Sequence, residues 1–124
     1  MEPRLTVDGI VCLPEGVVLI TRGHGPFKGW YALPGGFVEH ESTERAVVRE
    51  VWEETGLRTE VDRLVGVYSQ PGRDPRGHIV TVVYDLKIVG GRLVDGKPFP
   101  LDELPPLAFD HQRIIDDWRR SARK

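Results

Sequence analysis

Apolar and β-branched residues fall into short runs along the chain, and residues typical of turns separate these runs. The first two runs, residues 4–13 and 16–22, are separated by Pro14-Glu15-Gly16. Such a combination favours a tight turn, so the two runs predict a pair of strands joined as a hairpin. A shorter strand is expected within residues 30–36, where it ends at Pro34-Gly35-Gly36.

Two later runs, residues 59–70 and 78–89, also have the composition of strands. The proline- and glycine-containing segment 71–77 between them predicts a loop. Residues 90–107 are rich in turn formers and leave space for one short strand. Strands are therefore expected on both sides of the central part of the chain.

Two segments have the end signals of helices. Residues 43–55 follow Ser42, a favoured N-cap residue, and precede Gly56, which suits the left-handed C′ position. Residues 110–121 predict a second helix, with Asp110 at its N-cap. Strands on both sides of one helix, with another helix at the end, predict an α/β (α+β) fold. In such a fold a mixed sheet is covered by the two helices.

Size, charge and cysteine content narrow the function classes. With 124 residues the chain is long enough for one domain, residues 1–124, with its own core. The net charge of -2 gives no basic field for a nucleic-acid backbone, so nucleic acid is not an expected partner. The single cysteine, Cys12, excludes an internal disulfide and is expected in the core. No apolar run suits a signal peptide or a membrane span, which favours a cytoplasmic protein without a membrane partner.

The segment from Gly35 to Leu57 carries six glutamates, and three of them share one face of the predicted helix. On a helical wheel with Glu50 at zero, Glu54 lies about 40° to one side and Glu53 about 60° to the other. The roughly opposite side carries residues that we expect to pack on the sheet while the acids face outward: Val48, Val51 and Trp52.

The clustered negative charges of this acidic face need a positively charged partner. A solvated surface is the ordinary interpretation of a charge run, but Glu50 and Glu54 form an i, i+4 like-charge pair that weakens a helix. No lysine is interspersed among the acids. A hard divalent cation, Mg²⁺ or Mn²⁺, suits such oxygen ligands. Arg49 lies four residues before Glu53 and is expected to pair with it.

Gly35 and Gly36 come shortly before the acidic helix. Taken alone, they predict an ordinary turn. Glycines also let a backbone come close to a ligand, and a loop that enters a helix presents free N–H groups to anions. Beside the glutamates, a loop that contacts substrate and metal is the better interpretation.

The same segment resembles the signature of the Nudix hydrolases, G-x5-E-x7-R-E-U-x-E-E-x-G-U, where U is a bulky apolar residue. Every fixed position is present: Gly35, Glu41, Arg49, Glu50, Val51, Glu53, Glu54, Gly56 and Leu57. The resemblance implies an α/β/α sandwich with a mixed sheet between two main helices. It also implies metal-dependent hydrolysis of a nucleoside diphosphate linked to another moiety.

The resemblance further implies roles for the acidic residues. Glu50 and Glu54 would bind the cations, and Glu53 would be a further ligand or would activate the water. Gly35 would belong to the metal site, while Glu41 and Arg49 would support it. This chemistry is coherent, because divalent ions neutralise charge on phosphoryl oxygens and lower the pKa of the attacking water. The number of ions stays open.

The loop between the two long predicted strands bears on the substrate. Arg73 and Arg76 flank Asp74-Pro75 in the run "RDPRGH". By composition they are surface arginines of a hairpin loop, yet rigid guanidinium groups also suit phosphate. The run, together with "LPPLAFDHQRII", resembles the ADP-ribose pyrophosphatase branch of the family. That resemblance implies cleavage of ADP-ribose into AMP and ribose 5-phosphate.

Further substrate contacts are expected near the glycines. Trp30, with Tyr31 and Phe27, either stacks on the adenine or belongs to the core, and Gly36 lies in the substrate loop. His78 either contacts phosphate or orders its loop. His111 is expected only to start the second helix.

The general base and the exact substrate stay open at this point. Besides Glu53, the candidate bases are Asp95, Asp102 and Glu103, each of which alone reads as a turn or surface residue. Alternative substrates are nucleoside triphosphates, including oxidised ones, and dinucleoside polyphosphates. A non-catalytic ADP-ribose sensor is a further alternative, and a homodimer is possible by analogy.

Overall fold

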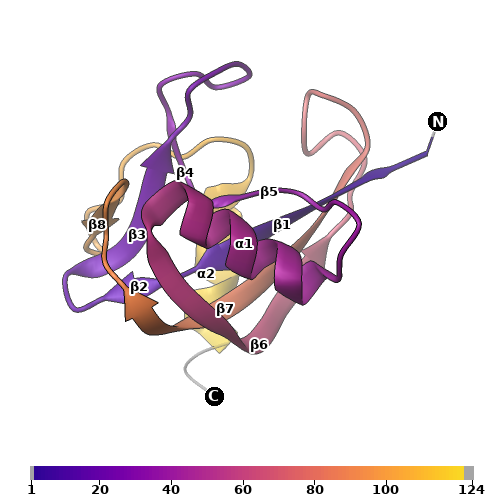
Figure 1. Ribbon diagram of the computed structural model, residues 1–124. Coiled ribbons are helices and arrows are strands. Elements are labelled where there is room, and N and C mark those ends of the chain that lie inside the picture. Colours follow the sequence, from indigo (N-terminus) through magenta and orange to yellow (C-terminus); the bar gives the residue numbers. More distant parts are fainter. Residues whose placement is uncertain (1, 122–124) are drawn as a thin grey trace.

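The computed structural model describes residues 2–121 (Figure 1). Its elements follow in this order: β1 (Arg4–Ile10), β2 (Cys12–Leu13), β3 (Gly16–Thr21), β4 (Tyr31–Ala32), β5 (Gly35–Phe37), α1 (Thr43–Thr55), β6 (Leu57–Tyr68), β7 (Ile79–Gly91), β8 (Lys97–Phe99) and α2 (His111–Ser121). The predicted strands and both predicted helices are present.

One sheet is mixed, as the sequence predicted. Its strand order is β5-β1-β7-β6, with β1 parallel to β7 and the other neighbours antiparallel. In this sheet Asp8 of β1 lies opposite Gly35 of β5. The region expected to be a loop of glycines therefore begins with a short edge strand, which fixes the backbone of Gly35 and Gly36.

A second sheet has the order β2-β3-β4, and β8 also pairs with β3. The hairpin predicted at Pro14-Glu15-Gly16 is confirmed as the β2–β3 connection. The first predicted strand, residues 4–13, divides after Ile10, because β1 belongs to one sheet and β2 to the other. Cys12 is exposed at this division, so the expectation of a core cysteine was wrong.

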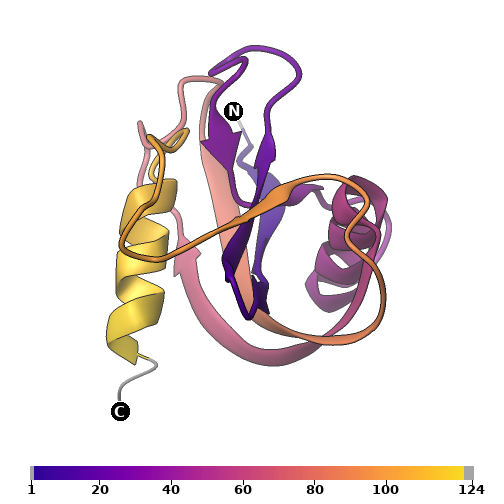
Figure 2. The same cartoon turned by 90° about the vertical axis from the view of Figure 1, so that its left-hand side faces the viewer.

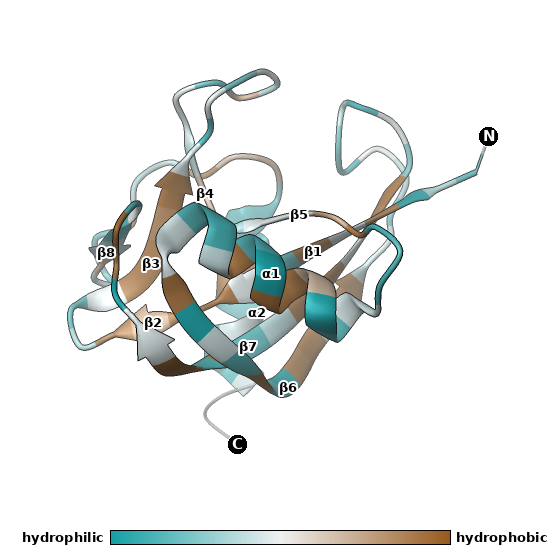
Figure 3. Cartoon of the chain, viewed as in Figure 1, coloured by the Kyte–Doolittle hydropathy of each residue, from teal (hydrophilic) through white to brown (hydrophobic). Residues whose placement is uncertain are grey.

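The strands lie between the two helices, with α1 on one side and α2 on the other (Figure 2). Each helix covers its own apolar cluster. Val47 and Val51 of α1 pack with Val7 of β1, while Ile114 and Ile115 of α2 pack in a separate cluster. Figure 3 shows the apolar side of α1 turned toward the strands and its polar side turned away. The expected α/β/α arrangement is confirmed.

Both ends of α1 match the sequence prediction. The side chain of Ser42 accepts a hydrogen bond from the backbone N–H of Arg45. Gly56 has φ of 85°, and its N–H donates to the carbonyl of Trp52. These caps satisfy backbone groups that the helix leaves free.

The packing face of α1 differs from the prediction. The buried residues are Ala46, Val47, Val51 and Thr55, whereas Trp52 is 50% exposed. On the wheel the buried face is therefore rotated toward Glu50 and Glu54. These two acids border the packed face and do not look outward.

The second helix begins at His111, one residue later than expected. Asp110 was expected to cap it, but its carboxylate accepts two hydrogen bonds from Arg73 instead. The guanidinium group of Arg73 donates to both carboxylate oxygens of Asp110. Such a bidentate, charge-assisted pair is stronger than a single capping hydrogen bond. Within residues 2–121, neither helix is long and apolar enough to cross a membrane.

Candidate active site

Arg49 is the centre of an ion-pair cluster on α1. Its Nε and Nη2 donate to the two carboxylate oxygens of Glu41 at 3.0 and 2.6 Å. Its Nη1 donates to Glu50 at 2.7 Å and lies 3.5 Å from Glu53. The predicted Arg49–Glu53 pair is present, but Glu41 and Glu50 are the closer partners. The hydrogen bond from Arg49 lowers the pKa of Glu41 to about 2.

Glu54 points from α1 toward β5. Its Oε1 accepts a hydrogen bond of 2.7 Å from the backbone N–H of Gly35. Burial raises the pKa of Glu54 to about 7, and the charges of Glu50 and Asp8 add to the rise, although the Gly35 bond opposes it. A divalent cation beside this carboxyl group would favour its charged form.

Glu50 is the second buried acid at this edge. Burial raises its pKa, even though Arg49 is bonded to it. Its carboxylate lies against Gly36, where an added Cβ would come within 2.5 Å of Oε2. Gly36 therefore leaves room for this carboxylate. Glu53, by contrast, has a side chain that is 48% exposed.

The donor set at this edge fits a hard divalent cation, because carboxylate oxygens are the ligands that Mg²⁺ and Mn²⁺ prefer. Glu50 and Glu54 each use one oxygen in a hydrogen bond to the described protein, which leaves the other oxygen for a ligand. No group of three His, Cys, Asp or Glu side chains within residues 2–121 is already arranged around one point. A cation held here would therefore need ligands from elsewhere as well, such as water or substrate.

A narrow cavity of about 70 Å³ lies beside Glu54 on the β5 side. Two short backbone stretches and several charged or aromatic side chains border it. Those that matter here are Asp8, Arg22, Gly35, Gly36, Phe37, Glu54, Arg73, Arg76, Phe109 and His111. Acidic groups thus meet basic groups in one small space.

Arg22 contributes to this cavity although sequence reasoning did not select it. Its Nε donates to the carbonyl of Pro26 at 2.7 Å, while its Nη2 is buried and has no hydrogen-bond partner in the described part of the chain. Its guanidinium lies 4.8 Å from the ring centre of Phe109. Burial lowers its pKa, and the nearby charge of Arg76 lowers it further. The available signal was weak, because Arg22 only follows the apolar strand β3.

The two arginines of the "RDPRGH" loop have different surroundings. Arg76 pairs with Asp74 at 2.8 Å and its guanidinium lies 5.0 Å from the ring centre of Phe109. The side chain of Arg73 is only 7% exposed, and it donates to Asp110, to the carbonyl of Ile79 and to the side chain of Thr81. Arg73 is thus placed to anchor the loop on β7 and on Asp110, the residue before α2, and both arginines border the cavity.

The aromatic residues form a row that leads away from the cavity. The ring of Phe27 lies edge-on to Phe109 at 4.9 Å and to Trp30 at 5.4 Å. Trp30 is 45% exposed and so does not belong to the core. Tyr31 packs instead against Phe99, in the apolar cluster beneath α2.

His78 and the candidate bases are also placed. His78 Nε2 bonds to the carbonyl of Ser69 across its loop at 2.9 Å, which matches the loop-ordering interpretation. Asp95 borders an open groove together with Glu53 and Glu54. Asp102 pairs with Arg119 of α2, on the opposite side of the strands, and Glu103 is exposed next to it.

Taken together, the fold is a mixed sheet between two helices, with an acidic helix and a basic cavity at one edge. A family model described as "NUDIX domain" matches residues 2–118 of the chain. The chain belongs to the NUDIX family, which confirms the resemblance seen in the sequence and, at the level of the family, the expected class of pyrophosphohydrolase.

Known proteins with similar sequence or structure include ADP-ribose enzymes and binders. An ADP-ribose pyrophosphatase of Methanocaldococcus jannaschii is 50% identical over 127 residues, which cover 97% of this chain and 75% of that protein. The NUDIX domain of Shewanella oneidensis NrtR, solved with ADP ribose, has a TM-score of 0.79 at 30% identity, over 98% of this chain and 90% of that one. An ADP-ribose pyrophosphatase structure from Streptococcus suis has a TM-score of 0.82 at 26% identity, over 99% and 94% of the two chains.

Proposed function

We propose that this chain hydrolyses ADP-ribose to AMP and ribose 5-phosphate with the help of Mg²⁺ or Mn²⁺. One observation carries the proposal: the Glu54 carboxylate borders a cavity in which a buried guanidinium nitrogen of Arg22 has no hydrogen-bond partner among residues 2–121. The carboxylate of Glu50 lies against Gly36, which also borders this cavity. Acids hold cations and arginines hold phosphates, so a diphosphate fits across the two. The relatives that cleave or bind ADP-ribose support this choice of substrate.

The acidic residues would have distinct tasks. Glu50 and Glu54 would hold the cation, and Arg49 would orient Glu50 while Glu41 fixes Arg49. Nudix hydrolases use divalent metal ions, and such an ion neutralises charge on the phosphoryl oxygens and makes water more acidic.

The proton of the attacking water needs an acceptor. Hydrolysis forms a bond from the water oxygen to one phosphorus and breaks the bond to the bridging oxygen, while the water proton passes to a base. Glu53 and Asp95 both border the groove beside Glu54 and are the two candidates that the geometry favours. Asp102 is committed to Arg119 on the other side and is not proposed.

The basic side of the cavity would hold the substrate phosphates. Arg22 lacks an ion-pair partner among residues 2–121, and its guanidinium and that of Arg76 lie 4.8 and 5.0 Å from the ring centre of Phe109. Arg73 would act indirectly, by anchoring the loop that carries Arg76. Phe27 and Trp30 would extend the pocket toward the nucleoside, and Gly36 would let the substrate approach β5.

Arg22→Gln is expected to raise KM for ADP-ribose about 10-fold or more while changing kcat less, because a charge-assisted bond to phosphate is lost. Steady-state kinetics at saturating metal would measure both constants. Arg45→Gln is the matched control, since Arg45 is an exposed arginine on α1. Equal KM values for wild type and Arg22→Gln would remove Arg22 from the phosphate site.

The substrate itself is tested by a product assay on ADP-ribose, NADH, ATP, dGTP, 8-oxo-dGTP and a diadenosine polyphosphate. Each compound is incubated with Mg²⁺, with Mn²⁺ and with EDTA. We expect the fastest turnover with ADP-ribose, with AMP as product and no turnover in EDTA. Faster cleavage of a triphosphate would overturn the proposed substrate but would leave the proposed metal site in place. Binding of ADP-ribose without cleavage would make the chain a sensor.

A further inference from the structure

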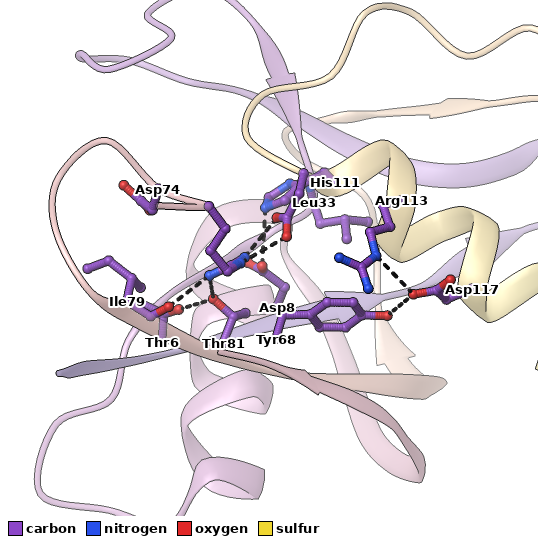
Figure 4. A network of polar contacts seen from close by, with 12 residues as sticks. Thr6, Asp8, Leu33, Tyr68, Asp74, Ile79, Thr81, His111, Arg113 and Asp117 are labelled. Atoms are coloured by element: carbon purple, nitrogen blue, oxygen red, sulfur yellow. Dashed lines mark hydrogen bonds and ion pairs between the residues drawn. The ribbon is translucent and has the colours of Figure 1, made fainter. Parts of the chain in front are cut away.

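A buried histidine joins α2 to the two strands that carry the site. His111, the first residue of α2, is only 4% exposed. Its Nδ1 accepts a hydrogen bond of 3.0 Å from the backbone N–H of Leu33, and its Nε2 lies 3.2 Å from Oδ2 of Asp8 (Figure 4). Because Nδ1 accepts a bond, the ring carries its proton on Nε2 and donates it to Asp8.

Both hydrogen-bond partners of His111, Leu33 and Asp8, lie close to Gly35. Asp8 lies opposite Gly35 in the sheet, so close that a Cβ on Gly35 would be 2.2 Å from Oδ1. Leu33 is two residues before Gly35, and the carbonyl of Pro34 between them accepts a bond from Gly9 at 2.9 Å. The imidazole therefore clamps the short turn Leu33–Gly35 and the strand beside it at the same time.

Gly35 in turn holds Glu54. Its N–H donates to Oε1 of Glu54 at 2.7 Å, which fixes where the other carboxylate oxygen points. The chain of contacts runs from His111 through Leu33 and Asp8 to Gly35 and ends at Glu54. Each link is a hydrogen bond or a contact too close for any side chain on Gly35.

We propose that His111 is a positioning residue: it holds the Leu33–Gly35 turn and Asp8 so that Gly35 presents Glu54 in the orientation that catalysis needs. The proposal rests on the proposed function and assigns to it a residue of α2 that lies outside the signature segment. Misplacing a group by about 1 Å can cost about 10²-fold in rate, so a distant clamp of this kind has a large effect.

Docking of α2 does not by itself explain this histidine. The helix is already held by Tyr68, which donates to Asp117 at 2.8 Å, and by Trp118, which donates to Asp85 at 3.0 Å. Ile114 and Ile115 are fully buried beneath it as well. Burying a polar pair such as His111 and Asp8 costs free energy, and an apolar side chain would dock the helix without that cost. The hydrogen bonds of His111 therefore indicate a role beyond docking.

The test compares His111→Ala with Tyr68→Phe, which removes a different bond between α2 and the strands. We expect His111→Ala to lower kcat for ADP-ribose at least about 10-fold with KM changed by less than about 2-fold. Tyr68→Phe should keep kcat within about 2-fold. His111→Asn keeps an acceptor for Leu33 but not the contact with Asp8, so its kcat should lie between those of wild type and His111→Ala.

A double-mutant cycle tests the route through Glu54. If His111 acts through Glu54, His111→Ala in a Glu54→Gln background should change the residual rate and the Mn²⁺ affinity by less than about 2-fold. Mn²⁺ affinity is measured by electron paramagnetic resonance, and hydrogen exchange reports the Leu33 and Gly35 amides. Losses that multiply in the double variant, or an unchanged kcat in folded His111→Ala or His111→Asn, would overturn the proposal.

The two claims fail in different ways. If wild type does not cleave ADP-ribose, the proposed function falls. In that case Mn²⁺ affinity and amide exchange still decide the positioning role, because both compare wild type with His111→Ala without any substrate. Weaker Mn²⁺ binding and faster exchange at Gly35 in the variant would support the clamp, and identical values would overturn it.

Discussion

Replacing Glu54 by glutamine is expected to lower kcat about 10³-fold or more and, at the same time, to stabilise the metal-free protein at pH 8. Glutamine keeps an oxygen that accepts the bond from Gly35, so the fold around the turn is maintained. It cannot provide the negative charge that holds a divalent cation. The loss therefore appears in kcat and in metal affinity together.

The gain in stability follows from the pKa of Glu54. In the folded protein the pKa of Glu54 is about 7, whereas the ordinary pKa of a glutamate is 4.5. Between these values the folded state binds more protons than the unfolded state, so the free energy of unfolding of wild type falls as the pH rises. At pH 8 the Glu54→Gln protein should be more stable by about 3 kcal/mol, and below pH 4.5 the difference should vanish.

Urea unfolding of both metal-free proteins at pH 4.5 and pH 8 measures this difference. Glu44→Gln is the matched control, because Glu44 is an exposed glutamate of α1 and its charge is not among those that act on Glu54. A glutamine variant at position 54 that loses stability at pH 8, or that keeps the wild-type rate, would contradict the role given to this residue.

Gly35→Ala is expected to lower the free energy of unfolding by about 3 kcal/mol and to abolish detectable activity. An alanine Cβ at this position would lie 2.0 Å from the carbonyl oxygen of Val7 and 2.2 Å from Oδ1 of Asp8. The backbone of β1 cannot move away without breaking the β1–β5 pairing. Any relief would shift the Gly35 N–H that holds Glu54.

Substitutions at two other glycines separate the effect on stability from the effect on metal binding. Gly23→Ala is the control for stability, since its Cβ meets nothing within 4 Å. Gly36→Ala would meet the side chain of Glu50 instead of backbone, so it should weaken metal binding more than folding. Thermal unfolding and Mn²⁺ titration distinguish the three variants. A Gly35→Ala protein as stable and as active as Gly23→Ala would refute the close packing at β5.

Much of the fold could be predicted from the sequence because the residues that end a helix or form a turn act on near neighbours in the chain. Ser42 and Gly56 mark the ends of α1 through bonds to residues only three or four positions away. The turn at Pro14-Glu15-Gly16 is likewise local, and the spacing of Glu50, Glu53 and Glu54 places them on one helix face whatever the rest of the chain does.

The parts that were missed depend on contacts between distant segments. The side of α1 that packs on the sheet is set by β1 and β7, so Trp52 is exposed where the wheel alone suggested packing. Arg73 finds Asp110, 37 residues away, and is thereby placed to anchor a loop. Arg22 is placed close to Arg76, a residue 54 positions later in the chain whose charge lowers the pKa of Arg22. No pattern along the sequence encodes such pairings.

The most direct test of the account is a ³¹P NMR time course of ADP-ribose with the wild-type protein and Mg²⁺, beside samples with EDTA and with Glu54→Gln. We predict that the diphosphate resonances of ADP-ribose are replaced by two monoester resonances, those of AMP and ribose 5-phosphate, only in the wild-type sample with metal. Unchanged diphosphate resonances with folded, metal-loaded wild type, or equal cleavage by Glu54→Gln, would contradict the central claim.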